Sequence, residues 1–360
     1  MTTSGERRST HPFYMYEAIH DQPRVIAELL DREKDAVISA AGMLKESSRI
    51  HLVGIGTSWH ASLVAEYMFK TFGQRIDACA WNAFEFCTKT PPLSTEDIVI
   101  VFTHRGFKLY PIQALDIAKA SPCKVIVITS TESKVDLTKI DQVIYTSYPD
   151  PSSAFTVSHT AAMTIACMLV TNLTGNSMLV NALHQLPAAV AKSLESDEQI
   201  KSLAQNYRDS TWFCFAGWGP NSATAYEVAL KINEAAYSVT TGFQLEQFLH
   251  GPFVAMTTGC FLSLIIPGEA GRARSIEIAK AAKTVGADVI ALSGGSDSNL
   301  TEVVDDVIEL PVVPEILEPI VYLVPLQLFT YWLAVSLKRN PDVFRLDDPK
   351  RQAARKLYTL

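Results

Sequence analysis

The chain repeats itself, and this duplication constrains its fold more than any other feature of the sequence. Residues 50–67 (IHLVGIGTSWHASLVAEY) resemble residues 212–230 (WFCFAGWGPNSATAYEVAL), and four shorter matches recur in the same order. All five matches are separated by 161 to 164 positions. Each copy opens with a short apolar run, a Gly-x-Gly turn and an alanine-rich stretch. Two such copies in 360 residues predict a duplicated domain.

Short β-branched runs alternate with helical stretches inside each copy. In the first copy we predict strands over residues 50–54, 98–102, 124–129 and 143–146, each bounded by turn residues. The segments between them carry apolar residues at helical spacing. Because neighbouring parallel strands need a helical crossover, the alternation predicts an α/β fold with a doubly wound, flavodoxin-like parallel sheet covered on both faces.

The repeat also sets the expected domain boundaries. A helix over residues 15–31 (MYEAIHDQPRVIAELLD) precedes the first copy, and a helical stretch that is polar on one side, residues 182–210, joins the copies. The expected parts are an N-terminal helical segment, a first domain, a second domain and a tail, over residues 1–30, 31–190, 200–345 and 346–360.

Composition excludes several classes of function. The net charge of −7 and the acidic pI argue against a nucleic-acid partner. The six cysteines show no C-x-x-C spacing, which argues against a zinc site or a disulfide framework and favours a cytoplasmic location. The apolar run 319–337 contains Pro325 and Gln327, so we expect a buried core helix and not a membrane span. Residues 1–14 lack the apolar core of a signal peptide.

The glycine loop VGIGTSWHA, residues 53–61, is the first candidate site. Parallel sheets bind ligands at the carboxyl ends of their strands, where a helix N-terminus attracts anions, so we expect Gly56, Thr57 and Ser58 to face a ligand. A dinucleotide fingerprint requires glycine where Trp59 stands, and no Walker loop occurs. A phosphate ester or sugar phosphate remains; the alternative is a capped turn that binds nothing.

Further motifs surround this loop: EAIHDQP (17–23), the EF of NAFEF (85–86), EVALKINEAAY (227–237), HGP (250–252) and VPLQLFTYWLA (324–334). With them, nearly the whole chain resembles the sugar isomerase (SIS) family in its doubled form. Specifically, it resembles the isomerase half of glucosamine-6-phosphate synthases and the related glucosamine-6-phosphate deaminases. The resemblance implies two tandem SIS domains that bind a hexose 6-phosphate. No metal-ligand cluster or nucleotide loop is visible, so we expect no cofactor.

The resemblance also implies catalytic residues. Glu234 matches the enolising base, Lys231 the active-site lysine, and His250 the ring-opening histidine, which the family supplies across a homodimer interface. These residue types suit the reaction, because aldose–ketose isomerisation through an enediol needs one carboxylate that moves a proton between neighbouring carbons. The alternatives are a solvated helical pair for Lys231 and Glu234, and a capping or core role for His250.

One loop departs from the family's hydroxyl-rich pattern S-Q-S-G-E-T. It reads THRGFK here, and its candidate binding residues are Thr103, His104, Arg105, Gly106 and Lys108. The cations could hold the same phosphate or serve a different anion. A third alternative is that Arg105 turns away into a salt bridge.

Two more elements are altered. Ser152 and Ser153, in SSAFTVSHT, still offer hydroxyls to a sugar, although the family's lysine in this segment is absent. Lys356 stands two residues later than the tail lysine with which the family forms an imine, so its alternative is an ordinary charged helix. The second glycine loop, GWGPNS, has only Ser222 as a hydroxyl and is expected to be structural.

These features lead to one main functional prediction. We expect a phosphosugar isomerase that acts on a hexose 6-phosphate or amino-sugar 6-phosphate, with deamination as a further outcome. Only about 14 residues precede the EAIHDQP region and none is cysteine, so we expect no glutaminase activity. The alternatives are a non-catalytic sugar-phosphate sensor and an isomerase or deglycase for another phosphorylated amino-sugar adduct.

Overall fold

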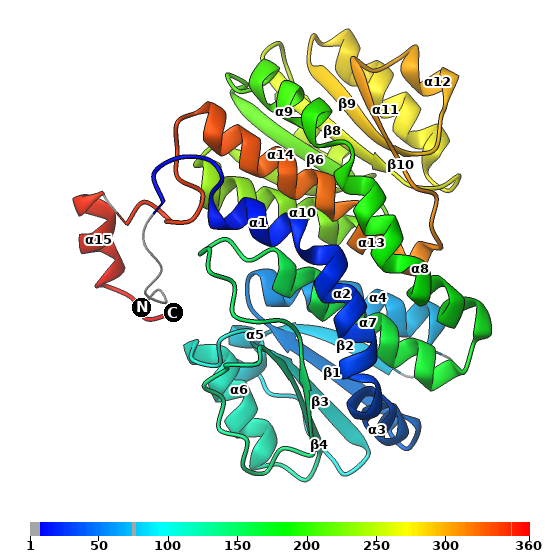
Figure 1. Ribbon diagram of the computed structural model, residues 1–360, viewed down its shortest axis with the longest axis vertical. Helices are drawn as coiled ribbons and strands as arrows, with labels where there is room; N and C mark the ends of the chain where they lie inside the picture. The colour runs from blue at the N-terminus through cyan, green and yellow to red at the C-terminus, as the bar shows by residue number, and fades with distance from the viewer. Residues whose placement is uncertain (1–7, 74–76, 347) are drawn as a thin grey trace. The chain divides into compact units, whose positions relative to one another are not determined.

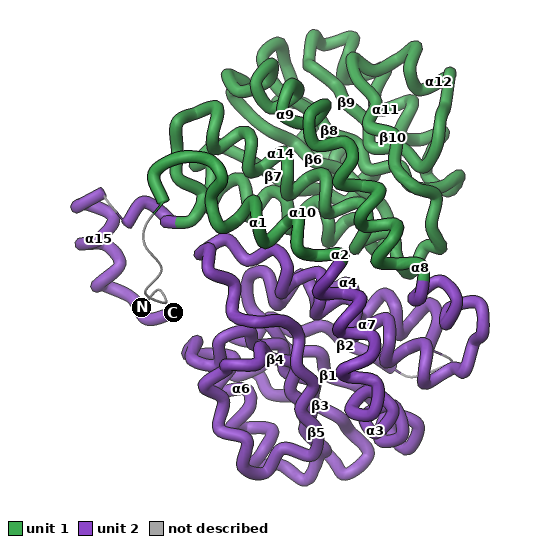
Figure 2. The backbone as a smooth tube through the Cα atoms, viewed as in Figure 1, with its two compact units in different colours: residues 1–23, 185–342 green, residues 24–184, 343–360 purple. Residues whose placement is uncertain are grey.

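The computed structural model describes residues 8–73, 77–346 and 348–360. Residues 1–7 of the expected N-terminal segment and residue 347 of the expected tail lie outside this description. The chain forms two compact units, residues 1–23 with 185–342 and residues 24–184 with 343–360 (Figure 1 and Figure 2). Each unit contains one five-stranded parallel sheet, which confirms the predicted duplicated α/β fold.

The first sheet has the order β2-β1-β3-β4-β5, which is the flavodoxin-like order with its switch point between β1 and β3. Its strands are β1 (Arg49–Gly54), β2 (Asp77–Asn82), β3 (Asp97–Phe102), β4 (Lys124–Thr129) and β5 (Gln142–Tyr145). Four of them lie within one residue of the predicted strands. The sequence pattern missed β2, because this edge strand (DACAWN) is mostly not buried and has no continuous β-branched run.

Helices cover both faces of the first sheet (Figure 1). The helices of this unit are α2 (Gln22–Arg32), α3 (Lys34–Lys45), α4 (Thr57–Phe72), α5 (Ala83–Thr88), α6 (Leu109–Lys119), α7 (Val157–Thr174) and the C-terminal α15 (Pro349–Arg355). Helices α5 and α6 pack on the valine-rich face that includes Val99 and Val101. Helix α7 packs against α3 and α4 and is buried along most of its length, so its sequence shows no polar face.

The second sheet repeats this order as β7-β6-β8-β9-β10. Its strands are β6 (Trp212–Gly217), β7 (Thr240–Gln244), β8 (Cys260–Ile266), β9 (Asp288–Gly294) and β10 (Asp306–Leu310). Its helices are α1 (Tyr14–His20), α9 (Asp197–Asn206), α10 (Asn221–Lys231), α11 (Arg272–Thr284), α12 (Ser298–Thr301), α13 (Glu318–Val321) and α14 (Leu323–Ser336). Helix α8 (Ser177–Leu194) begins in the unit of the first sheet and ends in the unit of the second. Phe329 of α14 stacks on Phe261 of β8 with ring centroids 5.3 Å apart, which fastens α14 to one face.

The single helix predicted over residues 15–31 is wrong in one respect, since α1 and α2 are separate helices that meet at Asp21. Pro23 has no N–H to donate to the carbonyl of Ile19, and the side chain of Gln22 donates to that carbonyl at 3.0 Å instead. The helical connection predicted over residues 182–210 is confirmed as α8 and α9.

Two described stretches are long and apolar enough to cross a membrane, α7 and residues 315–336. The protein itself buries 78% and 89% of their most apolar windows, respectively. The second stretch contains the run that was predicted to be a core helix, and this prediction is confirmed.

The glycines of the repeat have the same roles in both copies. A Cβ atom at Gly54 would lie 2.7 Å from the backbone nitrogen of Trp59, and one at Gly217 would lie 2.8 Å from the carbonyl carbon four residues on. Two positions later, Gly56 and Gly219 adopt φ angles of 58° and 55°. Both turns therefore need glycine twice: for close helix–strand approach and for left-handed backbone.

Candidate functional site

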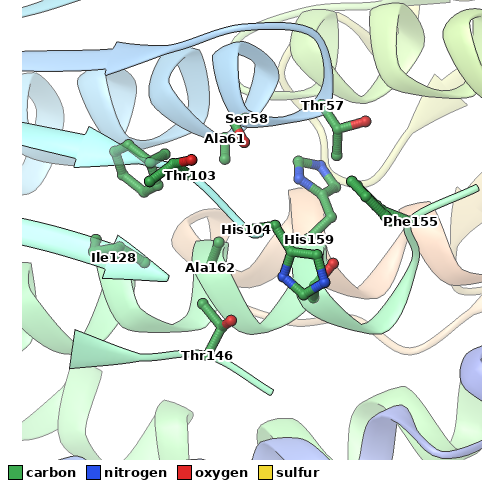
Figure 3. A pocket seen from close by; sticks show the side chains of 12 residues that line it. Thr57, Ser58, Ala61, Thr103, His104, Ile128, Thr146, Phe155, His159 and Ala162 are labelled. Atoms are coloured by element: carbon green, nitrogen blue, oxygen red, sulfur yellow. The ribbon is translucent and has the colours of Figure 1, made fainter. Parts of the chain in front are cut away.

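A pocket opens at the carboxyl edge of the first sheet, beside its switch point (Figure 3). It contains about 320 Å³ of empty space, part of which is open to solvent. Its wall is formed by the start of α4, the ends of β3 and β4, the residue after β5 and the start of α7. The lining residues are Thr57, Ser58, Ala61, Phe102, Thr103, His104, Ile128, Thr146, Phe155, Ser158, His159 and Ala162.

Two helix N-termini contribute to this wall. The first turn of α4 supplies Thr57 and Ser58, and the first turn of α7 supplies Ser158 and His159. Neither first turn contains an acidic residue. Because a helix N-terminus carries partial positive charge and hydroxyl groups add hydrogen-bond donors, this pocket is suited to an anion.

The two N-termini differ in what they already bind. The buried carboxylate of Asp150 accepts the backbone N–H groups of Thr156 and Ser158 at 3.4 and 3.3 Å, so it caps α7. Helix α4 begins after Gly56, and this N-cap residue has no side chain that could cap it. The N-terminus of α7 is therefore already engaged by a carboxylate of the protein, whereas that of α4 has no cap from its own N-cap residue.

Only part of the loop THRGFK lies in the wall of the pocket. Thr103 and His104 line the pocket, whereas Arg105, Gly106 and Lys108 are not part of its wall. Gly106 has a φ of 66°, and Lys108 is the residue immediately before α6. Two of the five predicted loop residues thus reach the pocket.

Arg105 binds the backbone of a neighbouring loop. Its Nη2 donates to the carbonyl oxygen of Asp150 at 2.7 Å, and its guanidinium lies 5.1 Å from the ring centre of Phe155. Burial lowers the pKa of Arg105, although the charge of Asp150 opposes this effect. The arginine therefore holds the 150–155 segment in place and is directed at the protein, not at the pocket.

His104 is held by the same segment. Its Nε2 accepts the backbone N–H of Asp150 at 3.1 Å, and its ring packs against Phe155 with centroids 4.8 Å apart. Burial lowers the pKa of His104 to about 3, and the charge of Arg105 acts in the same direction. The imidazole is therefore neutral, so the 3.7 Å separation between Nε2 and Asp150 Oδ2 is not an ion pair.

Ser152 and Ser153 do not line the pocket. The buried Ser152 accepts the backbone N–H of Ala154 at 3.1 Å. From the same segment, Ser158 and His159 line it, and sequence reasoning did not select them. The sequence does contain a signal for these two residues. A long apolar helix begins at residue 157, so Ser158 and His159 lie in its first turn, where ligands bind.

The predicted lysine and carboxylate lie in the other unit, at the end of α10. Lys231 is 1% exposed, and its Nζ lies 2.5 Å from Glu234 Oε2 and 3.6 Å from Oε1 of the fully buried Glu227. Glu234 retains 25% exposure and belongs to a π-helical turn, η1 (Ile232–Ala236), that continues α10. These are buried charges and not a solvated surface pair. Buried charge clusters and π-turns both concentrate at functional sites.

Two other predicted catalytic residues are exposed. His250 follows the short helix η2 (Gln247–Leu249), its side chain is 68% exposed, and its Nε2 lies 3.4 Å from Glu246 Oε1. Lys356 follows α15 and is also exposed. The catalytic roles of Lys231, Glu234, His250 and Lys356 stay predictions.

At the corresponding edge of the second sheet, the protein's own side chains interact with one another. Asn221, the counterpart of Ser58 in the repeat, donates from Nδ2 to Glu318 Oε2 at 3.1 Å, and both residues are buried. Burial, together with the charge of Glu315, raises the pKa of Glu318 to about 8. Ser222 Oγ donates to a backbone carbonyl at 3.0 Å. The second glycine loop is thus engaged within its own unit.

The paired α/β domains, with a pocket at the switch point of the first, are typical of proteins that bind a small ligand at the carboxyl ends of parallel strands. The family model for the SIS domain matches residues 43–172 and 208–337, which is more than half of the chain. The chain belongs to the SIS domain family, with two such domains in tandem. The predicted resemblance to the doubled SIS family is confirmed.

Among curated relatives, the chain is 30% identical over 348 residues to the glutamine–fructose-6-phosphate aminotransferase (isomerizing) of Pyrococcus horikoshii. The match covers 95% of this chain and 58% of that protein, so the chain spans somewhat more than half of the relative's length. A second relative with the same name, from Thermococcus kodakarensis, is 29% identical with the same coverage.

Solved structures show the same fold. The C-terminal domain of glucosamine-fructose-6-phosphate aminotransferase from Francisella tularensis matches with a TM-score of 0.81 at 18% identity, covering 94% of this chain and 99% of that chain. Glucosamine-6-phosphate deaminase from Thermotoga maritima matches with a TM-score of 0.77 at 19% identity, covering 93% and 98%.

Proposed function

We propose that this chain is a phosphosugar isomerase that interconverts an aldose and a ketose 6-phosphate, with a hexose or amino-sugar 6-phosphate as substrate. The observation that carries the proposal is the buried ammonium of Lys231 between the carboxylates of Glu227 and Glu234. Burying the two charges of Lys231 and Glu227 costs several kcal/mol each by general estimates, and buried charges beside a partly exposed carboxylate are typical of catalytic sites. The similarity to isomerising aminotransferases supports the same reaction class.

The division of the chemistry between the pocket residues and Glu234 with Lys231 follows the resemblance to the doubled SIS family. The pocket holds the phosphate with the hydroxyls of Thr57 and Ser58 and the positive end of α4. The carboxylate of Glu234 takes the proton from the carbon beside the carbonyl and returns it to the neighbouring carbon of the enediol. The ammonium of Lys231 keeps Glu234 ionised and stabilises developing negative charge. With an amino sugar, hydrolysis of the resulting imine releases ammonia and completes deamination.

Two further elements of this proposal depend on the resemblance. In a homodimer, the exposed His250 of one copy opens the sugar ring at the site of the other by moving a proton to and from the ring oxygen. Lys356 forms an imine with the open-chain ketose in the same reaction. The cytoplasmic location stays a prediction from the cysteine pattern.

A product assay tests the function. The protein is incubated with glucosamine 6-phosphate, and fructose 6-phosphate and ammonia are measured. We expect turnover by the wild type and a loss of about 100-fold or more in the E234Q variant, which is the usual contribution of a general base. The matched control is E277Q, since Glu277 is an exposed carboxylate of α11 paired with Arg274, and it should retain full activity.

A screen of phosphorylated sugars separates the alternatives. If a hexose 6-phosphate raises the melting temperature but no sugar phosphate or fructosamine 6-phosphate adduct turns over, the protein is a sensor and the proposed activity is wrong. Turnover of an adduct in place of glucosamine 6-phosphate keeps the isomerase mechanism and changes the substrate.

A further inference from the structure

The turn that carries Glu234 is held by a side chain that the proposed chemistry does not use. Asn233 precedes Glu234 in the π-helical turn η1. Its Nδ2 donates to the carbonyl oxygen of Ala229 at 2.8 Å and to that of Thr240 at 3.2 Å. Both partners are carbonyl oxygens, which only accept, so the amide nitrogen and not the amide oxygen must face them. One side chain therefore links α10 to the start of β7.

The carbonyl of Thr240 is available for this bond because β7 stands at the edge of the second sheet, next to β6. The N–H of Phe213 in β6 donates to the carbonyl of Val239, one residue before Thr240. Successive carbonyls of a strand point to opposite sides, so that of Thr240 faces the free edge of the sheet. The amide of Asn233 reaches it there, and this contact ties the turn to the sheet.

The residues of η1 are fastened in two different ways. Ile232, Ala235 and Ala236 are buried, and the turn packs against α14. Asn233 and Glu234 are the two residues of the turn that are not buried, so apolar packing does not fix them. Because π-helical turns are rare and less favourable than α-helical ones, a polar contact at this point stabilises the shape of the turn.

We propose that Asn233 is a positioning residue for the proton transfer. Its bridge between α10 and β7 holds η1 in the shape that places a carboxylate oxygen of Glu234 2.5 Å from the ammonium of Lys231. The inference rests on the proposed isomerase function, because it takes Glu234 as the base, and Asn233 acts only through that carboxylate. Displacing a reacting group by about 1 Å can cost about 100-fold in rate, so loss of the bridge should lower kcat about 10- to 100-fold.

Two substitutions separate the two hydrogen bonds. N233A removes both of them. In N233S, the hydroxyl can donate to the carbonyl four residues earlier, as serines in helices do, but it is too short to reach β7 as well. We expect both variants to lose about 10- to 100-fold in kcat. KM should stay within about twofold of the wild type, because the pocket that holds the phosphate is lined by no residue of η1.

N206A is the matched control, since Asn206 is an exposed asparagine at the end of α9 in the same unit, and it should keep the kcat and KM of the wild type.

A pH profile distinguishes positioning from a loss of stability. Lys231 faces Glu234 from α10, with Glu227 on its other side. Arg339, which follows α14, packs on the ring of Tyr237 at the end of the turn. Without the bridge, Glu234 moves away from the ammonium and its ionised form is less stabilised, so the acidic limb of the kcat/KM profile should shift to higher pH in the alanine variant. A merely structural role would lower the melting temperature without moving this limb.

Titration of the carboxyl group itself gives a readout that does not depend on turnover. Protein labelled with carbon-13 at the glutamate side-chain carboxyls is titrated by NMR, and the resonance missing from E234Q identifies Glu234. This resonance should titrate at higher pH in N233A than in the wild type. An unchanged titration in N233A, or wild-type kcat in either variant, would overturn the positioning role of the bridge.

The outcomes separate this inference from the proposed function. If N233A turns over glucosamine 6-phosphate as fast as the wild type does, only this inference is wrong. If the titration of Glu234 shifts in N233A as expected but no sugar phosphate is turned over by the wild type, the bridge positions the carboxylate and the isomerase activity is wrong.

Discussion

Replacing the first glycine of each repeat with alanine should separate folding from binding. A Cβ at Gly54 would lie 2.7 Å from the nitrogen of Trp59, and one at Gly217 would lie 2.8 Å from the carbonyl carbon of Asn221. Ordinary Cβ contacts begin near 3.4 Å, so in both variants the helix must move away from its strand by more than half an ångström. The atoms that block each Cβ are backbone, which cannot change rotamer.

The magnitude follows from this geometry. Overpacking against a rigid neighbour costs about 1–3 kcal/mol, which corresponds to a fall in melting temperature of roughly 2–10 °C for a protein of this size. The two variants should be destabilised by similar amounts. Only Gly54→Ala moves the first turn of α4, which lines the pocket, so this variant should lose about 10-fold or more in phosphate affinity while Gly217→Ala keeps it.

Thermal unfolding and phosphate titration of both variants provide the assay. Gly42→Ala is the control, because Gly42 lies inside α3 and a Cβ there meets nothing within 4 Å. This variant should be stabilised by roughly 1 kcal/mol and bind normally, since alanine is the better helix former. Equal loss of phosphate affinity in Gly54→Ala and Gly217→Ala, or no loss in either, would refute the assignment of binding to the first repeat.

Two further predictions concern buried charges. Lys231→Met leaves the carboxylate of Glu227 buried without the ammonium group beside it, so the free energy of unfolding in urea should fall by about 3–5 kcal/mol. Adding Glu227→Gln should recover part of this loss. A urea midpoint of Lys231→Met equal to that of the wild type would contradict the burial of this pair. Glu318 has a pKa raised from 4.5 to about 8, so the folded state holds a proton that the unfolded state releases. Its contribution to stability is complete below about pH 4.5 and is lost as the pH rises through about 8, with a slope of at most about 1.4 kcal/mol per pH unit. Urea unfolding at pH 5 and pH 8 should therefore show a smaller decrease for Glu318→Gln than for the wild type, and parallel decreases would count against a protonated Glu318.

The fold was largely predictable because the sequence contains two copies of the same domain. Strand periodicity, helical crossovers and the two glycine turns recur at one spacing, so each copy supports the assignment of the other. The edge strand β2 was missed because it is mostly not buried and has no continuous β-branched run. The break between α1 and α2 was missed because a proline near the start of a helix and one in its middle look alike in sequence.

The site was predictable only in part. The glycine loop supplied Thr57 and Ser58 because anion binding at a helix N-terminus follows from local geometry. The tasks of His104 and Arg105 depend on Asp150, which lies 45 residues beyond Arg105 in the chain and whose position no local pattern reveals. Residue type suggested that both would contact a phosphate; tertiary contacts direct Arg105 to the protein and leave His104 at the pocket.

The central claim is that Glu234 carries a proton between neighbouring carbons of a phosphorylated sugar, and solvent exchange tests it most directly. Fructose 6-phosphate is incubated with the protein in D₂O, and proton NMR follows the replacement of a C1 proton by deuterium. A carboxylate that relays protons exchanges with solvent, so the wild type should introduce deuterium there and E234Q should do so at least about 100-fold more slowly. Unlabelled sugar after prolonged incubation with the wild type, or equal labelling by E234Q, would contradict the account.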